Sequence, residues 1–213
     1  MTVPARPTTA VRLAALVVGL ALLLLPAAPA LAGPVSDQFR ADLMRVLKTV
    51  EESEGKPEAA RRAAIRSAAE PVFDWREMAA RALAVHWQAR SEAERTEFVR
   101  LFTDLVERAY ISKVERYSGE PVNLVGEKVE GGLAVVQTRF ITTKGQEVPM
   151  DYRLISKDRW RVYDVIIEGV SLVGNYRTQF DRVIRSSSYA KLVERLKTPT
   201  PASPAPAPAR PSS

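Results

Sequence analysis

The segment at residues 160–167, WRVYDVII, constrains the fold most, because it has the pattern of a strand without a polar face. Alternate side chains of a strand point to opposite sides, so strict alternation places Trp160, Val162 and Ile166 on one face and Tyr163, Val165 and Ile167 on the other. Strands with one face in water alternate apolar with polar residues, whereas strands buried on both faces do not. The sequence therefore predicts a strand between two layers. It leaves open whether protein or a bound molecule forms the second layer.

The first half of the chain predicts helices, because apolar residues recur there at helical spacing. We expect these helices at residues 35–50, at 58–69, from Asp74 through Trp87, and from Ser91 to about Tyr117. Two of the starts carry capping-box sequences, Asp74-x-x-Glu77 and Ser91-x-x-Glu94, in which side chains bond the free N–H groups of the first turn. The apolar stripe of the helix from Ser91 is wide, which predicts contact with a large apolar surface.

The second half predicts an antiparallel meander, because glycine-containing turns separate short apolar segments. We expect strands at residues 121–129, 133–143, 146–156 and 160–167, followed by helices at 171–185 and 189–197. Helices, then strands, then helices is the order of an α+β fold. We expect the N-terminal and C-terminal helices to pack on one face of a curved four-stranded antiparallel sheet.

The first 32 residues have the pattern of a cleavable secretory signal peptide. Arg6 and Arg12 give a positive start, an apolar run follows, and the small residues Ala30 and Ala32 form a cleavage site. An uncleaved membrane anchor is the alternative, although the apolar run is short for a membrane span. We expect export to the periplasm after cleavage behind Ala32.

The C-terminal segment limits the extent of the folded domain, and the composition limits the kinds of site and partner. Residues 198–213 are rich in Pro, Ala and Ser, which predicts a disordered tail, so the folded domain is expected at 33–197. The chain has no cysteine, so we expect no disulfide, no lipoprotein anchor and no cysteine-based metal site. The net charge is +6, and two of these charges lie in the signal sequence. The remaining +4 is too small to favour nucleic acid as a partner.

Two residues are candidates for acid–base chemistry. His86 is the only histidine, and Asp164 lies inside the apolar strand, where burial can raise a carboxyl pKa. Both also fit structural roles, His86 as a hydrogen-bonded helix residue and Asp164 as a bonding partner of backbone or arginine groups. The sequence has no G-x-S-x-G or H-E-x-x-H motif and no phosphate-binding glycine loop. A small isomerase or hydrolase on a cone-shaped α+β fold stays an alternative.

Basic residues are interleaved with the apolar residues of the expected strands. They favour an ordinary solvated face, and the alternative is that some of them approach lipid phosphates or an acidic partner. These residues are Arg139, Lys144, Arg153, Lys157, Arg159 and Arg161.

Two segments resemble the MlaC (toluene-tolerance) family of periplasmic phospholipid-binding proteins. They are VFDWREMAARALAVHWQARSEAERTEFVRLFTDLVERAYISKVERYSGE and the more specific QEVPMDYRLISKDRWRVYDVIIEGVSLVGNYRTQF. The resemblance runs from about residue 35 to 197. It implies a non-enzymatic carrier that holds phospholipid in an apolar cavity between the sheet and the helices. No cofactor or metal is implied, and phospholipid is the cargo.

The resemblance also implies partners. Such carriers shuttle lipid between an outer-membrane lipoprotein–porin complex and an inner-membrane complex of an MCE-domain protein with an ABC transporter, and so maintain outer-membrane lipid asymmetry. Two acyl chains in water would cost on the order of 20 kcal/mol, so a carrier has to cover them. Two alternatives are a hopanoid-type cargo, as in some relatives, and an envelope adaptor that binds through its Pro-rich tail.

We expect the cavity to be lined by apolar and aromatic side chains from the long helix, the strands and the helix after them. These are Phe98, Phe102, Leu105, Tyr110, Val136, Phe140, Met150, Tyr152, Leu154, Val162, Ile166 and Tyr176. The same residue types line both a cavity and a solid core, so the sequence does not distinguish the two.

Overall fold

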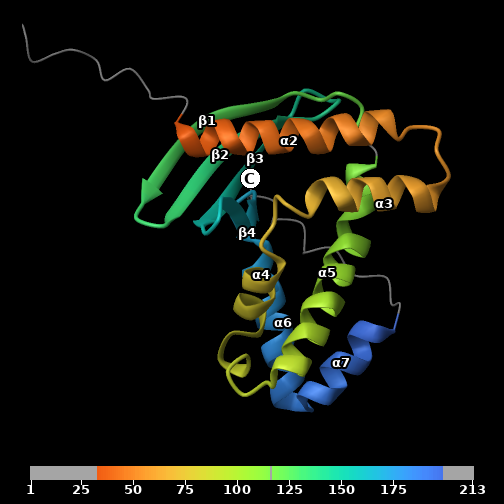
Figure 1. Cartoon of the computed structure of the whole chain (residues 1–213), viewed down its shortest axis with the longest axis vertical. Helices are drawn as coiled ribbons and strands as arrows, with labels where there is room; N and C mark the ends of the chain where they lie inside the picture. The colour runs from red at the N-terminus through yellow and green to blue at the C-terminus, as the bar shows by residue number, and fades with distance from the viewer. Residues whose placement is uncertain (1–32, 116, 199–213) are drawn as a thin grey trace, which may run out of the picture. The chain divides into compact units, whose positions relative to one another are not determined.

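A computed structural model describes residues 33–115 and 117–198. The expected signal peptide and, apart from Thr198, the expected tail lie outside the described residues. The N-terminal helices are α2 (Pro34–Glu52), α3 (Glu58–Ala69), α4 (Trp75–Leu83), the 3-10 helix η2 (Ala84–His86) and α5 (Glu92–Val114). The strands are β1 (Val122–Glu130), β2 (Leu133–Ile141), β3 (Glu147–Ser156), β4 (Trp160–Ile167) and β5 (Val170–Ser171). The helices α6 (Leu172–Ser186) and α7 (Tyr189–Lys197) follow (Figure 1).

The fold class is the predicted one, α+β with a curved antiparallel sheet. The sheet has the order β1-β2-β3-β4-β5, so each strand pairs with its neighbour in the chain. A two-residue fifth strand is added to the four that we expected. It forms because Glu168 and Gly169 both have positive φ, 50° and 83°, which turns the chain back onto the end of β4.

The helix starts follow the capping signals, and one helix end does not follow the prediction. Ser91 and Glu94 form the complete capping box of α5, and Asp74 accepts a hydrogen bond from the backbone N–H of Glu77 at 2.9 Å. The expected helix through Trp87 ends at Leu83, because Ala84 adopts φ 47° and leaves the helical conformation. Trp87 therefore follows a short 3-10 turn.

A β-bulge changes which residues of β4 share a face. Leu154 pairs with Val162 and Arg153 pairs with Asp164, so Tyr163 is an extra residue without a partner on β3. Strict alternation, which we expected, is therefore wrong at this point. Val162, Val165 and Ile167 share one face with Met150, Tyr152 and Leu154, whereas Ile166 lies on the other face opposite Asp151. The backbone of Val162 also bonds Val72 and Asp74, which fixes β4 at this position.

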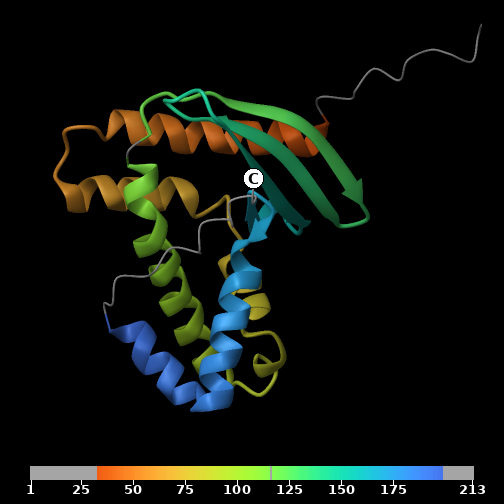
Figure 2. The same cartoon turned by 180° about the vertical axis from the view of Figure 1, so that it is seen from behind.

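Two large apolar clusters contain most of the interior. The helices α4, α5, α6 and α7 lie together on one side of the molecule (Figure 2). They form the helix cluster around Phe98, Phe102 and Phe180, and Tyr163 of β4 belongs to it. The sheet cluster joins α2 to the strands through Val35, Phe39, Val136, Leu154 and Val162. Protein thus covers both sides of β4. No helix of the described residues is long and apolar enough to span a bilayer.

Candidate functional site

The apolar face of the sheet under α2 is the candidate site. Ala134, Val136, Tyr152, Leu154, Val162 and Val165 form this face in the register of the strands. The helix α2 covers it with Val35, Phe39, Leu43 and Val46, and the rings of Phe39 and Tyr152 lie 4.5 Å apart between centroids. Several members at its edges, including Leu43, Met150 and Ile167, are only half-buried. One helix therefore covers a broad apolar surface incompletely.

Polar contacts hold α2 near the N-terminal end of the helix. The backbone N–H and the hydroxyl of Ser36 both donate to Oε2 of Glu127 on β1, each at 2.7 Å. On the other side, Gln38 Nε2 donates to the Trp160 carbonyl at 2.7 Å, and the Trp160 N–H donates to Gln38 Oε1 at 3.2 Å. These bonds join α2 to strands 91 and 122 residues later in the chain.

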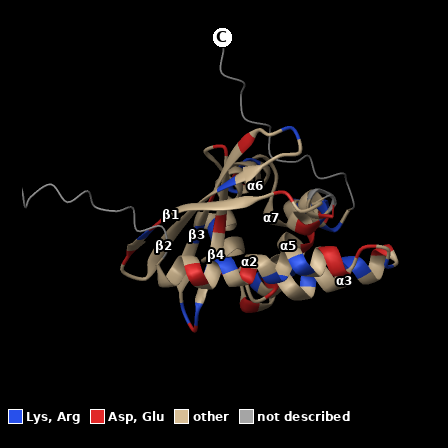
Figure 3. Cartoon of the chain, turned by 90° about the horizontal axis from the view of Figure 1, so that it is seen from above, with Lys and Arg blue, Asp and Glu red and all other residues tan. Residues whose placement is uncertain are grey.

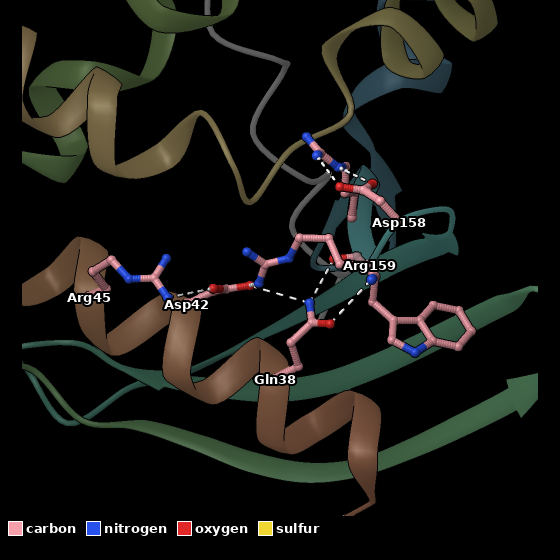
Figure 4. A network of polar contacts seen from close by, with 7 residues as sticks. Gln38, Asp42, Arg45, Asp158 and Arg159 are labelled. Carbon is pink, nitrogen blue, oxygen red and sulfur yellow. Dashed lines mark hydrogen bonds and ion pairs between the residues drawn. The ribbon is translucent and has the colours of Figure 1, made fainter.

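The carboxylate of Asp42, one turn further along α2, also contacts the sheet side of the structure. Asp42, which is 2% exposed, is paired with Arg159 from the β3–β4 turn and with Arg45 at 3.0 Å (Figure 4). The first contact crosses from helix to sheet, and the second stays within α2. Together with Gln38 they form what we call the α2 latch, defined as Gln38, Asp42, Arg159 and Trp160. The latch is the polar border of the apolar face.

Replacing Gln38 with Ala is expected to loosen α2 while the fold stays intact. The variant loses two hydrogen bonds to Trp160 and a longer one, 3.4 Å, to Asp42. The two to Trp160 are worth about 1 kcal/mol each, so transient opening of α2 should rise roughly tenfold or more. Hydrogen exchange of α2 followed by mass spectrometry measures this change. The matched control is Gln179→Ala, because Gln179 is exposed on α6 and its side chain bonds only Asn175 within the described part of the chain. Equal exchange of α2 in both variants would contradict a latch.

The predicted lining residues fall into two separate groups. The sheet cluster contains Val136, Met150, Tyr152, Leu154 and Val162. The helix cluster contains Phe98, Phe102, Leu105, Tyr110 and Tyr176, and its aromatic rings contact one another at 5.6–6.4 Å between centroids. Phe140 shares the face of Val136 but belongs to neither cluster, and Ile166 lies on the opposite face. Phe73 packs against both clusters and connects them.

The sequence reasoning missed the residues of α2 that cover the sheet. Val35, Phe39, Leu43 and Val46 recur at helical spacing, so their signal was present as the apolar stripe of the first helix. Nothing in that stripe indicates which partner it meets. Acidic and basic residues are interspersed along α2 and α3 (Figure 3), and the apolar stripe of α2 is the part that packs on the sheet.

Tyrosine hydroxyls near these clusters stay protonated at physiological pH. Burial raises the pKa of the Tyr152 hydroxyl to about 12 and also raises the pKa of Tyr176. The Tyr176 hydroxyl is buried and has no hydrogen-bond partner among the described residues. Neither group is therefore suited to act as a base.

The two candidates for acid–base chemistry have structural partners. Asp164 is 3% exposed and accepts hydrogen bonds from the Ser171 hydroxyl at 2.6 Å, the Val173 N–H at 3.0 Å and Arg153 at 3.2 Å. These bonds fix the start of α6 to β4. His86 contacts Asp181 at 2.9 Å, and hydrogen bonds from Arg185 and His86 lower the pKa of the Asp181 carboxyl. Among the described residues, no group of His, Asp and Glu is arranged to hold a metal ion.

A shallow groove lies beside the sheet cluster, between α3, α5 and the start of β4. It has a volume of about 730 Å³ and a floor that includes Ala59, Ala63 and Pro71. Two of its arginines are paired, Arg62 with Glu58 at 2.6 Å and Arg161 with Asp158 at 2.8 Å. The groove therefore adds apolar surface near the sheet. The charges of these two arginines are compensated by their partners.

Comparisons with known proteins identify the family and support the fold. Residues 37–198 match the family of the MlaC protein. The fold is similar to a solved structure of a phospholipid-binding protein from Ralstonia solanacearum in complex with a phospholipid, with a TM-score of 0.70 and 21% sequence identity. The similarity covers 77% of this chain and 95% of that one. Since the family match spans most of the sequence, the chain belongs to the MlaC family.

Proposed function

We propose that the protein is a periplasmic phospholipid carrier. The acyl chains of the bound phospholipid lie against the sheet face under α2. The observation that carries this proposal is the broad apolar face, covered by a single helix and half-buried at its edges. A fold shared with a phospholipid-bound protein supports it. Each methylene moved from water onto such a face gains about 0.8 kcal/mol, so the face supplies affinity without specific chemistry.

Loading of lipid would require α2 to separate from the sheet. Phe39 packs on Tyr152, so side chains fill the space between helix and strands. An acyl chain can enter only where these side chains separate. The half-buried edge at Leu43, Met150 and Ile167 is the favoured entry point, because the fewest contacts have to be broken there. The latch then limits how far and how often α2 opens. Lipid binding and α2 opening are coupled in this proposal.

Membership of the MlaC family supports a proposal for the wider role. We propose that the carrier shuttles lipid between an outer-membrane lipoprotein–porin complex and an inner-membrane complex of an MCE-domain protein with an ABC transporter. The periplasmic location is supported by the signal-peptide pattern of residues 1–32. The transporter's ATPase would supply the energy, because the carrier itself needs only to bind and release.

Direct extraction tests the proposal. The full chain is exported in its host, purified without detergent and extracted with organic solvent, and the extract is examined by mass spectrometry. Phospholipid is expected in near-stoichiometric amount, and the spectrum also gives the head group and the number of chains. A hopanoid in its place would support the alternative cargo. A folded protein that yields neither would count against a carrier and favour the adaptor or enzyme alternatives.

A further inference from the structure

A second concavity lies between α4, β3, β4 and the start of α6. Its volume is about 480 Å³, and its lining includes Arg81, Arg153 and Arg177 together with Tyr163 and Trp87. Arg153 and Asp164 alternate with Leu154 and Val162 in the strands, so the pocket is on the opposite face of β3 and β4 from α2. It is therefore separate from the apolar face described above. We refer to it as the arginine pocket.

The charges of the arginine pocket are not balanced within it. Its lining contains three arginines, each from a different element, and one carboxylate, Asp164, while Arg81 is also paired with Glu77 just outside the lining. Both oxygens of Asp164 already accept hydrogen bonds, from Ser171, Val173 and Arg153. Arg177 is exposed and makes no ion pair or hydrogen bond with any described residue. The pocket thus presents a net positive charge.

Two of the three arginines are held in place. The Arg81 guanidinium stacks on the Tyr163 ring, 4.2 Å from its centroid, and its Nε donates to Glu77 at 2.8 Å. Arg153 is fixed by its bond to Asp164. Both keep further N–H groups, since a guanidinium carries five. Held cations with spare donors lose little side-chain entropy when an anion binds.

From this geometry we infer that the arginine pocket binds a phosphoryl group. A carboxylate is satisfied by one bidentate arginine, whereas the oxygens of a phosphoryl group accept bonds from several guanidinium groups at once. The rings of Tyr163 and Trp87 and the small side chains of Ala80 and Ala84 leave room for a short organic group attached to the phosphate. Two sources provide this chemistry, a free phosphate ester and the head group of a phospholipid.

The inference does not rest on the acyl-chain proposal. The two sites lie on opposite faces of β4, and Arg177 is not a member of the sheet cluster. A variant of Arg177 should therefore lose phosphate binding and still carry extractable lipid. The failure of one proposal is thereby distinguishable from the failure of the other.

Calorimetric titration of the full chain at low salt tests the site with two probes, inorganic phosphate and sn-glycerol 3-phosphate. Arg177→Gln and Arg81→Gln are each expected to weaken glycerol phosphate binding about tenfold, because each removes charge-assisted hydrogen bonds. Arg182→Gln is the matched control, since Arg182 is an exposed arginine of α6 outside the pocket. Thermal unfolding of Arg81→Gln checks that losing its contact with Tyr163 leaves the fold intact.

Vesicles distinguish the two sources of phosphate. Sedimentation with vesicles of phosphatidylglycerol and phosphatidylcholine should depend on Arg177 if a head group is the ligand. Binding of glycerol phosphate without vesicle binding would assign the pocket to free phosphate esters, and either result supports a phosphoryl site. The inference is overturned if neither soluble probe binds, or if wild type and Arg177→Gln bind them equally.

Discussion

Replacing Leu43 with Asp is expected to remove at least nine-tenths of the bound phospholipid. Leu43 is half-buried on α2 and packs against the sheet cluster. A carboxylate at this position would face acyl chains without a partner, and burying such a group costs about 2 kcal/mol or more, which is roughly a thirtyfold loss of affinity. The free energy of unfolding should fall by less than the free energy of lipid binding, because in the lipid-free protein the carboxylate can turn toward water. Lipid content is measured by extraction and mass spectrometry.

The neighbouring residue supplies the control for this experiment. Met44 is 59% exposed on the outer side of α2, so Met44→Asp changes the charge of the same helix away from the sheet. We expect Met44→Asp to retain its lipid and both variants to show folded circular dichroism spectra. If Leu43→Asp is folded and fully loaded, the acyl chains do not lie under α2. Equal loss in both variants would point to a charge effect and not to contact.

Replacing Asp164 with Ala is expected to lower the free energy of unfolding by about 3 kcal/mol. The side chain is buried, and its loss leaves the Ser171 hydroxyl, the Val173 N–H and Arg153 without their acceptor. These groups tie the start of α6 to β4, so the junction between the helix cluster and the sheet is weakened. Urea unfolding at neutral pH, followed by tryptophan fluorescence, measures the change.

Asp158→Ala is the comparison for this stability measurement. Asp158 also pairs with an arginine, Arg161, at 2.8 Å, but its side chain is 64% exposed. Exposed ion pairs contribute about 0–1 kcal/mol, so this variant should remain close to wild type. A loss below 1 kcal/mol for Asp164→Ala would show that the buried network is dispensable. The structural role that we assign to Asp164 would then be wrong.

Local signals in the sequence predicted the elements well. Ser91 caps α5 as expected, and turns at Gly131 and Gly145 separate the strands. These signals depend on a few neighbouring residues, so they can be recognised without the fold. The bulge at Tyr163 depends instead on the pairing of Val162 with residues 72–74, which is a contact between distant segments. Alternation along one strand cannot reveal it.

The candidate site was predicted less completely than the fold. Periodicity shows that a residue such as Phe102 or Leu154 is apolar and inward, but not which of two clusters it joins. The predicted lining therefore combined both. The arginine pocket was indicated only as interleaved basic residues, with Arg153 among them. Arg81 and Arg177 join it because α4 and α6 both approach β4, which is a property of the tertiary structure.

The long separation between α2 and its partners has a consequence for biogenesis. This helix is synthesised before every strand, yet the residues that hold it come 91 and 122 positions later. The strands pair with their sequence neighbours, so the meander closes shorter loops and is expected to assemble first. A newly synthesised molecule would then pass through a stage in which the apolar face of the sheet is uncovered and α2 is not yet docked. In the proposed carrier, lipid would compete with α2 at that stage, so the first cargo would be acquired during maturation, before the proposed membrane complexes are met.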